Sequence, residues 1–221
     1  MATNYSYTVT VLLDVNETQD VDARAESRSY IVADRESGKA VIIDAVIENV
    51  ERDVRIVKEL GLTLLFAIET HVHADHITGA SLLKDRVGAQ IVYGGGAAGV
   101  VTGADLFLSD GQDLRFGNSA LKALATPGHT DGCTSYVLPG AVFTGDTLFI
   151  RGNGRTDLQG GSAATLFESV RGKLFALPDD TVVYPGHDYQ GRVSSTIGEE
   201  KRFNERLNLS IDKDVFVELM N

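Results

Sequence analysis

Cysteine and positive charge are both scarce in this chain of 221 residues. The one cysteine, Cys133, excludes a disulfide framework and any zinc or iron–sulfur site built from thiolates. The 20 lysines and arginines are outnumbered by 31 aspartates and glutamates, so the formal net charge is −11. Because the basic residues are scattered among acidic ones rather than clustered, the sequence lacks the basic surface that nucleic acid or an anionic membrane requires. We therefore expect neither partner, and any metal ligands should be histidine and carboxylate.

Long apolar runs and low-complexity tracts are also missing. No run approaches the length of a membrane span, and the first residues lack the basic and apolar regions of a secretion signal. With 43% hydrophobic residues, the composition is that of a globular protein, and we expect a single domain over residues 1–221. The lone cysteine is typical of a reducing compartment. We expect the cytoplasm, or an organelle matrix if a presequence has been removed.

Short β-forming runs alternate with helical patterns along the chain. Strands are predicted at residues 28–33, 40–44, 64–69, 90–93, 121–126, 134–138, 141–144 and 181–184. Helices are predicted over about 47–60, 76–86, 162–177 and 212–220. The glycines at 94–96 lack the spacing of a phosphate-binding loop, and we interpret them as a turn. This order predicts sheets covered by helices in a layered α/β fold.

Three of the five histidines lie in one short segment, Thr70-His71-Val72-His73-Ala74-Asp75-His76, directly after the predicted strand at 64–69. Side chains two apart in an extended segment point the same way, so His71 and His73 are expected to face one pocket. Asp75 and His76 would enter that pocket from the following turn.

The other two histidines and one aspartate follow three further strands. His129 and His187 each come after a Pro-Gly pair, whose glycine permits a tight turn, and Asp146 follows the strand at 141–144. A single histidine at a strand end is usually a structural or surface residue, but five of five favour a common site. Imidazole and carboxylate together suit iron, zinc or manganese with open coordination positions. The sequence therefore predicts metal-dependent chemistry.

The HxHxDH segment, with a later histidine, aspartate and histidine in that order, resembles the metallo-β-lactamase superfamily. That resemblance implies a four-layer αββα sandwich with the metal site at one edge of its two sheets. The superfamily positions are filled by His71, His73, Asp75, His76, His129, Asp146 and His187. Taken alone, they would fit a dinuclear hydrolase such as glyoxalase II, in which Asp146 would bridge two metals.

Longer segments resemble the persulfide dioxygenases of this superfamily. They are residues 70–79, 127–133, 143–159 and 184–189, and the Arg-Thr-Asp-Leu-Gln run at 155–159 is the most specific. Glyoxalase II also usually carries a long C-terminal helical domain, for which the residues after His187 leave too little room. The resemblance implies an iron-dependent dioxygenase that converts glutathione persulfide, dioxygen and water to sulfite and glutathione.

The same resemblance implies the roles of single residues. His71, His129 and Asp146 would be the ligands of one non-haem Fe(II) per chain, a triad that leaves positions for substrate and dioxygen. Arg155 would pair with a glutathione carboxylate, and Tyr189 would reach the substrate near the iron. The remaining motif residues would surround and orient the ligands without binding the metal: His73, Asp75, His76 and His187. A homodimer is also suggested.

Two other hypotheses remain open at this point. One is a dinuclear hydrolase that acts on hydroxyacylglutathione thioesters without dioxygen. The other is a metal or persulfide sensor without catalytic activity, which the complete set of metal-ligating residue types disfavours. Cys133 follows the His129 motif in an apolar context, and we interpret it as a packed small residue rather than a nucleophile.

Overall fold

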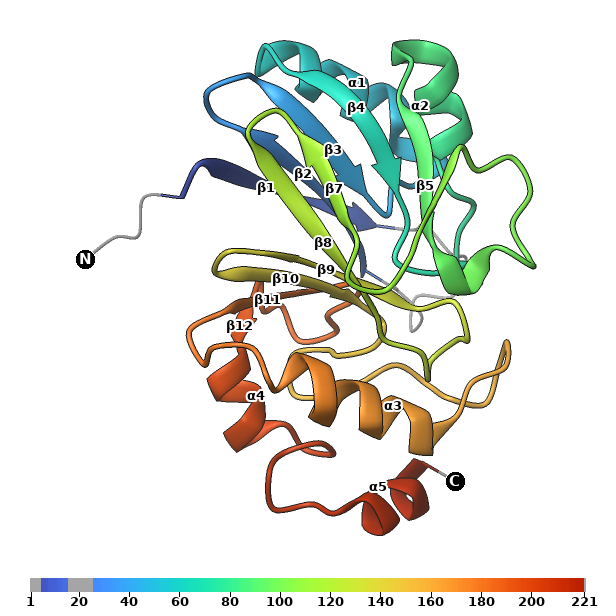
Figure 1. The fold of residues 1–221 in the computed structure, drawn as a ribbon, viewed down its shortest axis with the longest axis vertical. Coiled ribbons are helices and arrows are strands. Elements are labelled where there is room, and N and C mark those ends of the chain that lie inside the picture. The colour runs from blue at the N-terminus through green and yellow to red at the C-terminus, as the bar shows by residue number, and fades with distance from the viewer. Residues whose placement is uncertain (1–4, 16–25, 221) are drawn as a thin grey trace.

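Two six-stranded mixed sheets lie face to face, each covered by helices on its outer side (Figure 1). The structure is a computed structural model that describes residues 5–15 and 26–220. Residues 1–4, on which the expected absence of a secretion signal partly rests, lie outside the described residues. The layers are those of the metallo-β-lactamase sandwich that the motifs predict.

The first sheet is formed by the N-terminal half of the chain. Its strands follow one another in chain order: β1 (Tyr7–Val15), β2 (Glu26–Asp34), β3 (Lys39–Ile43), β4 (Thr63–Ile68), β5 (Gln90–Gly94) and β6 (Leu106–Leu108). The pairs from β3 to β6 are parallel, whereas β1, β2 and β3 pair antiparallel. Two helices cover this sheet, α1 (Val50–Glu59) and α2 (Ala80–Val87).

The second sheet is formed by the C-terminal half. Its strands lie in the order β12 (Ser195–Thr196), β11 (Val182–Pro185), β10 (Ala141–Gly145), β9 (Thr134–Leu138), β8 (Ser119–Ala125) and β7 (Asp113–Phe116). Only β10 and β11 pair in parallel. The helices below it in Figure 1 are α3 (Ala163–Ser169), α4 (Ile197–Phe203) and α5 (Lys213–Met220).

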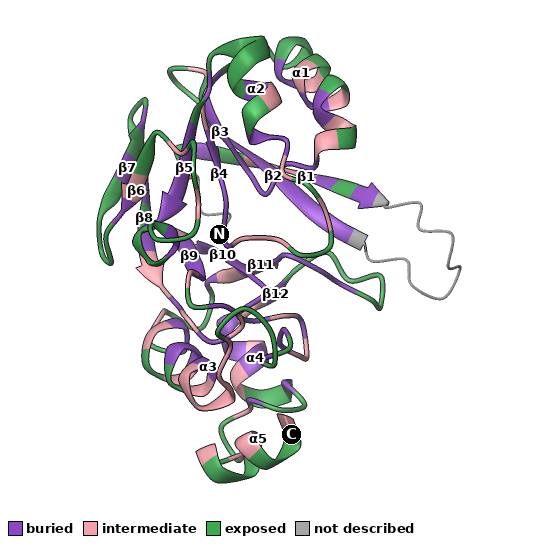
Figure 2. Cartoon of the chain, turned by 90° about the vertical axis from the view of Figure 1, so that its right-hand side faces the viewer, coloured by how far each residue is buried: buried purple, intermediate pink, exposed green. Residues whose placement is uncertain are grey.

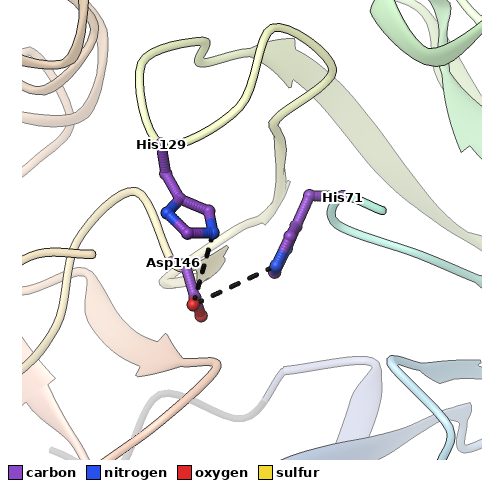
Figure 3. A group of neighbouring side chains, drawn as sticks. All are labelled: His71, His129 and Asp146. Carbon is purple, nitrogen blue, oxygen red and sulfur yellow. Dashed lines mark ion pairs between the residues drawn. The ribbon is translucent and has the colours of Figure 1, made fainter. Parts of the chain in front are cut away.

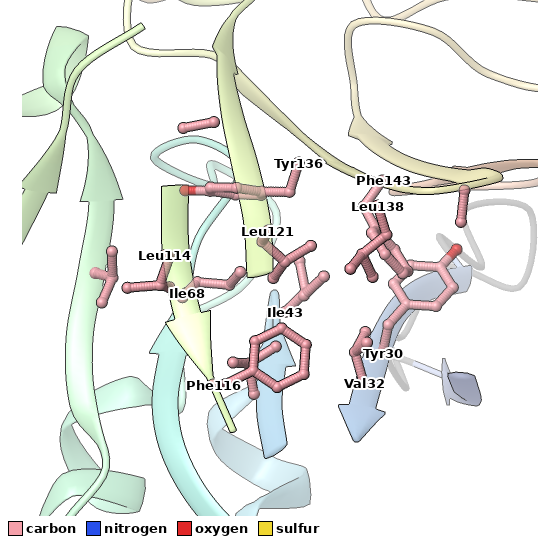
Figure 4. Packing of buried hydrophobic residues seen from close by; sticks show 14 of the residues in the cluster. Tyr30, Val32, Ile43, Ile68, Leu114, Phe116, Leu121, Tyr136, Leu138 and Phe143 are labelled. Carbon is pink, nitrogen blue, oxygen red and sulfur yellow. The ribbon is translucent and has the colours of Figure 1, made fainter. Parts of the chain in front are cut away.

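The main core lies between the sheets, and strand alternation explains its composition. Along β2, Tyr30 and Val32 pack into this core, while Ile31 and Ala33 face the layer of α1 and α2. Tyr30 and Phe116 are among the largest fully buried side chains, and each such side chain contributes roughly 1.5–3 kcal/mol of burial free energy (Figure 4). Figure 2 shows the resulting contrast between buried sheets and helices whose outer faces are exposed.

All eight predicted strands are confirmed to within two residues at their ends. The predicted helix start at His76 is wrong, because residues 74–76 form bends and Thr78 pairs with Val46 in an isolated bridge. Helix α2 therefore begins only after Gly79. The predicted helix start near residue 162 is confirmed, since the Ser162 hydroxyl oxygen caps α3 by accepting the Thr165 N–H at 3.3 Å. Strands β1, β6, β7 and β12 and helix α4 were not predicted. Among the described residues, no helix has both the length and the apolarity to cross a bilayer.

Candidate metal centre

His71, His129 and Asp146 converge from three different strand ends (Figure 3). They follow β4, β8 and β10, whose ends meet at the same edge of the sandwich. Asp146 Oδ2 lies 3.6 Å from His129 Nε2 and 4.0 Å from His71 Nε2. The three residues each offer a ligand atom within 4.8 Å of the others, which is close enough for one metal ion to bind all three.

The turn before His129 requires glycine. Gly128 has φ of 140°, and a Cβ at that position would lie 2.3 Å from Leu166 Cα. His129 Nδ1 is 2.7 Å from the Arg155 carbonyl oxygen. Because a carbonyl can only accept, Nδ1 carries the hydrogen and the lone pair of Nε2 is left for a metal.

A hydroxyl relay orients His71 in the same manner. Thr70 Oγ1 donates to Asp44 Oδ2 at 2.8 Å, and it lies 3.0 Å from His71 Nδ1. The hydroxyl hydrogen is already used by the carboxylate, so Thr70 accepts from Nδ1–H and Nε2 is free. Burial, together with the charge of His73, holds the pKa of His71 well below its usual range, which keeps the imidazole neutral and able to bind a metal.

The surroundings of Asp146 fit a cation. Asp146 Oδ1 is buried, and no hydrogen-bond donor reaches it from the residues the structure describes. A Cβ at Gly186 would lie 2.4 Å from Asp146 Oδ1, and one at Gly154 would lie 3.0 Å from His129 Nδ1. The two glycines therefore leave room that side chains would fill. A buried carboxylate oxygen without a donor is costly unless a cation neutralises it, and two free imidazole nitrogens beside it complete a metal-binding donor set.

His73 does not face the same pocket as His71, so that expectation is wrong. The two rings lie side by side with centroids 4.1 Å apart, but the chain bends at residues 70–71 instead of continuing as a strand. His73 Nε2 lies 3.2 Å from Asp44 Oδ1 and 3.2 Å from Glu69 Oε2. Burial opposes charge on His73, but these two carboxylates outweigh it and raise its pKa well above the usual value.

The other three motif residues form a chain beside the triad. Asp75 Oδ2 lies 3.1 Å from His76 Nδ1 and 3.6 Å from His187 Nε2, which is itself 3.6 Å from Asp146 Oδ2. Partial burial of Asp75 favours its neutral form, but the neighbouring imidazoles of His76 and His187 hold its pKa far below the usual range. His73, Asp75 and His76 also offer ligand atoms within 4.8 Å of one another, so a second ion has candidate ligands here.

A cavity of about 970 Å³ opens in front of the triad and reaches the C-terminal helix. Arg155 lines it, but its guanidinium is already paired with Asp157 through Nε–Oδ1 and Nη2–Oδ2 distances of 2.6 and 2.7 Å. Tyr189 also lines it, 66% exposed, with its ring stacked on His187 at 6.0 Å. Arg206 and Met220, absent from the predicted site, form part of the far wall. Only the fold brings them there, because no motif surrounds them in sequence.

Cys133 is buried next to the triad and takes no part in it. Burial raises the pKa of its thiol to about 11, and Thr130 N–H lies 3.3 Å from the sulfur. A protonated, enclosed thiol is a poor nucleophile. This agrees with its interpretation as a packed small residue.

The family model described as the metallo-beta-lactamase superfamily matches residues 24–187. The chain belongs to this superfamily. It is 50% identical over 197 residues to the mitochondrial persulfide dioxygenase of Homo sapiens. The aligned region covers 87% of this chain and 75% of that protein. It is 39% identical over 175 residues to a hydroxyacylglutathione hydrolase of Brucella anthropi, covering 78% of this chain and 65% of that one.

Among solved structures of the superfamily, the chain resembles the crystal structure of ETHE1 from Myxococcus xanthus. The TM-score is 0.84 at 42% sequence identity, and the match covers 95% of this chain and 89% of that one. The likeness therefore extends through both sheets and the helices outside them.

Proposed function

We propose that this protein is a persulfide dioxygenase that uses one Fe(II) held by His71, His129 and Asp146. The observation that carries the proposal is the donor set: two imidazole Nε2 atoms with free lone pairs and one buried carboxylate facing an open cavity. Two histidines and one carboxylate are the ligands of non-haem iron oxygenases. The similarity to persulfide dioxygenases supports the same reaction.

The reaction is the oxidation of glutathione persulfide to sulfite. One persulfide, one dioxygen and one water give glutathione, sulfite and two protons, so the terminal sulfur gains three oxygens and the sulfur–sulfur bond breaks. Iron bound at the triad supplies the redox chemistry with dioxygen, which zinc cannot supply. The protein binds and orients the substrate around that chemistry.

The cavity residues provide the orientation. Arg155 is the guanidinium that would bind a carboxylate of the glutathione portion, and its exposed pair with Asp157 is readily exchanged because surface ion pairs contribute little. Tyr189 places its ring over His187 at the edge of the cavity, where it would contact the sulfur end of the substrate. His187, Asp75 and His76 would hold Asp146 and the cavity wall in place.

A second candidate is a dinuclear hydrolase of hydroxyacylglutathione. Asp146 Oδ2 is equally distant, at 3.6 Å, from His129 Nε2 and His187 Nε2, as a bridging carboxylate would be. The relative from Brucella anthropi carries that name. The Nε2 atom of His73 is directed at the carboxylates of Asp44 and Glu69, so it is not free to bind a metal beside the triad. We therefore rank the dinuclear hydrolase second.

Dioxygen uptake separates the two candidates. Protein purified without oxygen and loaded with Fe(II) is mixed with fresh glutathione persulfide, and uptake and sulfite are measured together. The dioxygenase predicts one sulfite per dioxygen and no hydrolysis of S-lactoylglutathione under argon. Hydrolysis under argon with no uptake from fully loaded protein would establish the hydrolase instead.

A further inference from the structure

One buried arginine lies beneath the loop that carries Tyr189. We call residues 186–193 the tyrosine loop; it follows β11 and leads toward β12. Arg28 in β2 is 2% exposed, and its main-chain N–H donates to the Gly186 carbonyl at 3.0 Å. The preceding residue, Ser27, pairs with His187 in an isolated antiparallel bridge. The first sheet thus contacts the loop directly at its root.

The guanidinium of Arg28 binds both ends of the tyrosine loop. Its Nη1 donates to the Val193 carbonyl at 2.9 Å, and its Nη2 donates to the Arg192 carbonyl and to Asp188 Oδ2, the latter at 3.3 Å. Asp188 is 3% exposed, and its Oδ2 also accepts the main-chain N–H groups of Gln190 and Arg192. A single buried cation therefore joins the side chain at the start of the loop to the carbonyls at its end.

Little else fixes the tip of this loop. Residues 189–194 are all exposed, Tyr189 to 66% and Val193 to 54%, so apolar burial does not determine their conformation. Tyr189 touches the rest of the site through its ring, stacked on His187 and edge-on to Phe149 at 6.3 Å. Buried charged networks can specify one conformation without adding much stability, because each unmade hydrogen bond disfavours the alternatives.

We propose that Arg28 is the positioning residue of the active site's tyrosine. Its guanidinium selects the conformation of the tyrosine loop in which Tyr189 lies over His187 at the cavity, and so it sets the apparent affinity for the persulfide. Arg28 does not line the cavity, and it acts only through the loop. The part of this inference that concerns substrate rests on the proposed function; the part that concerns loop order does not.

The first test separates binding from turnover. Arg28→Met keeps the length and much of the volume of the side chain but removes every side-chain hydrogen bond to the loop. We expect KM for glutathione persulfide to rise about tenfold while kcat changes less than about threefold and iron content stays at the wild-type level, as for a lost binding geometry. Arg52→Met is the matched control, because Arg52 pairs with Asp14 and Asp53 and makes no contact with the tyrosine loop.

A second readout follows loop order without activity. The chain has no tryptophan, so Val193→Trp introduces a single fluorescent reporter at an exposed loop position. We expect its steady-state anisotropy to fall when Arg28→Met is added and to stay unchanged when Arg52→Met is added. Arg28→Lys retains the charge beside Asp188 but cannot reach both carbonyls, and it should restore part of the anisotropy and part of KM.

In Arg28→Met the buried carboxylate of Asp188 loses its cationic partner, which destabilises the fold. Arg28→Met is therefore also combined with Asp188→Asn. The double variant has neither charge, and the side-chain oxygen at position 188 still accepts the N–H groups of the loop. If neither the single nor the double variant folds, Arg28→Lys is the test. A KM and an anisotropy equal to those of the protein with Arg28 would then overturn the proposal. Folded variants that match the Arg52→Met control in both readouts overturn it as well. If wild-type protein consumes no dioxygen, the proposed function fails, while the anisotropy series still tests the role of Arg28 in the loop.

Discussion

Two clusters built from the same residue types each take one histidine from the segment 70–76, and they differ in where that histidine's Nε2 is directed. The metal triad is His71, His129 and Asp146; the acid cluster is Asp44, Glu69 and His73. In the acid cluster Asp44 accepts the N–H and the hydroxyl of Thr70, and Glu69 accepts the Thr78 hydroxyl at 2.5 Å. Both clusters contain buried atoms without a hydrogen-bond partner among the described residues. In the triad this atom is Asp146 Oδ1; in the acid cluster they include Glu69 Oε2 and His73 Nε2, which lie 3.2 Å apart as an ion pair.

Residue composition alone does not identify a metal site. Both clusters combine imidazole with carboxylate, and both are buried enough to exclude bulk water from most of their atoms. What distinguishes them is where the free lone pairs point: His71 and His129 direct theirs into the cavity, whereas His73 Nε2 is directed at two carboxylates. The ligand atoms of the acid cluster also lie within 4.8 Å of one another, but only the triad lines the cavity. The acid cluster supports the triad from behind through Thr70.

Removing a triad carboxylate should have the largest effect. Asp146→Ala deletes the only carboxylate of the triad. We expect iron affinity to fall more than about 100-fold, which exceeds the usual loss when a residue that only supports a ligand is removed. Sulfite production should be lost as well. Iron per chain after anaerobic loading and desalting measures this. Asp113→Ala, at an exposed pair with Lys122, is the control. Wild-type iron content in Asp146→Ala would contradict the ligand assignment.

Breaking the acid cluster should have a smaller effect on the same quantity. Asp44→Asn weakens the acceptor that orients Thr70 and, through it, His71. We expect iron affinity to fall about 10–100-fold while the protein stays folded. Competition with a fluorescent chelator gives the iron affinity. Asp34→Asn is the control, because it tests whether replacing any buried aspartate lowers the iron affinity. A loss equal to that of Asp146→Ala would mean that the clusters are not separate.

His187→Ala should change iron content less than either. His187 lies 3.6 Å from Asp146 Oδ2 and would orient that carboxylate without binding iron. We expect most of the iron to remain, within about tenfold in affinity, and KM for the persulfide to rise because Tyr189 loses its stacking partner. Complete loss of iron from this variant would show that His187 is a ligand and that the mononuclear assignment is wrong.

Cys133→Ala should have the smallest effect, with iron content and kcat within about twofold of wild type. Because the thiol has a folded pKa of about 11, it is protonated throughout the range from pH 6 to 9. At pH 8 iodoacetamide should therefore label native Cys133 about 100-fold more slowly than the unfolded chain. Equal labelling rates in the native and unfolded protein would refute the burial argument.

Much of the fold could be predicted because its signals are local. Each of the eight predicted strands is a short run rich in apolar residues between turn residues, and the Pro-Gly pairs before His129 and His187 mark their turns. The alternating Thr and Val residues of strand β1 are also typical of a strand. The short strands β6 and β12, with three and two residues, have no such pattern and form because neighbouring strands offer hydrogen-bond partners.

The site was predictable in its motif residues but not in its contacts. Spacing placed His71 and His73 together, yet it could not show that a bend turns one of them toward Asp44 and Glu69. Asp44 lies in a left-handed conformation with φ of 55° after β3, and nothing in the sequence marks it as a partner of the histidine segment. Arg28 and Arg206 likewise meet the site only through the packing of distant segments.

The central claim is that one iron ion, held by the triad, is sufficient for the reaction. Stepwise addition of Fe(II) to metal-free protein under argon, followed by glutathione persulfide and a pulse of dioxygen, tests it directly with sulfite as the readout. Sulfite production is expected to rise linearly and to reach its plateau at one iron per chain. A plateau at two irons per chain, with little activity below the first equivalent, would contradict it.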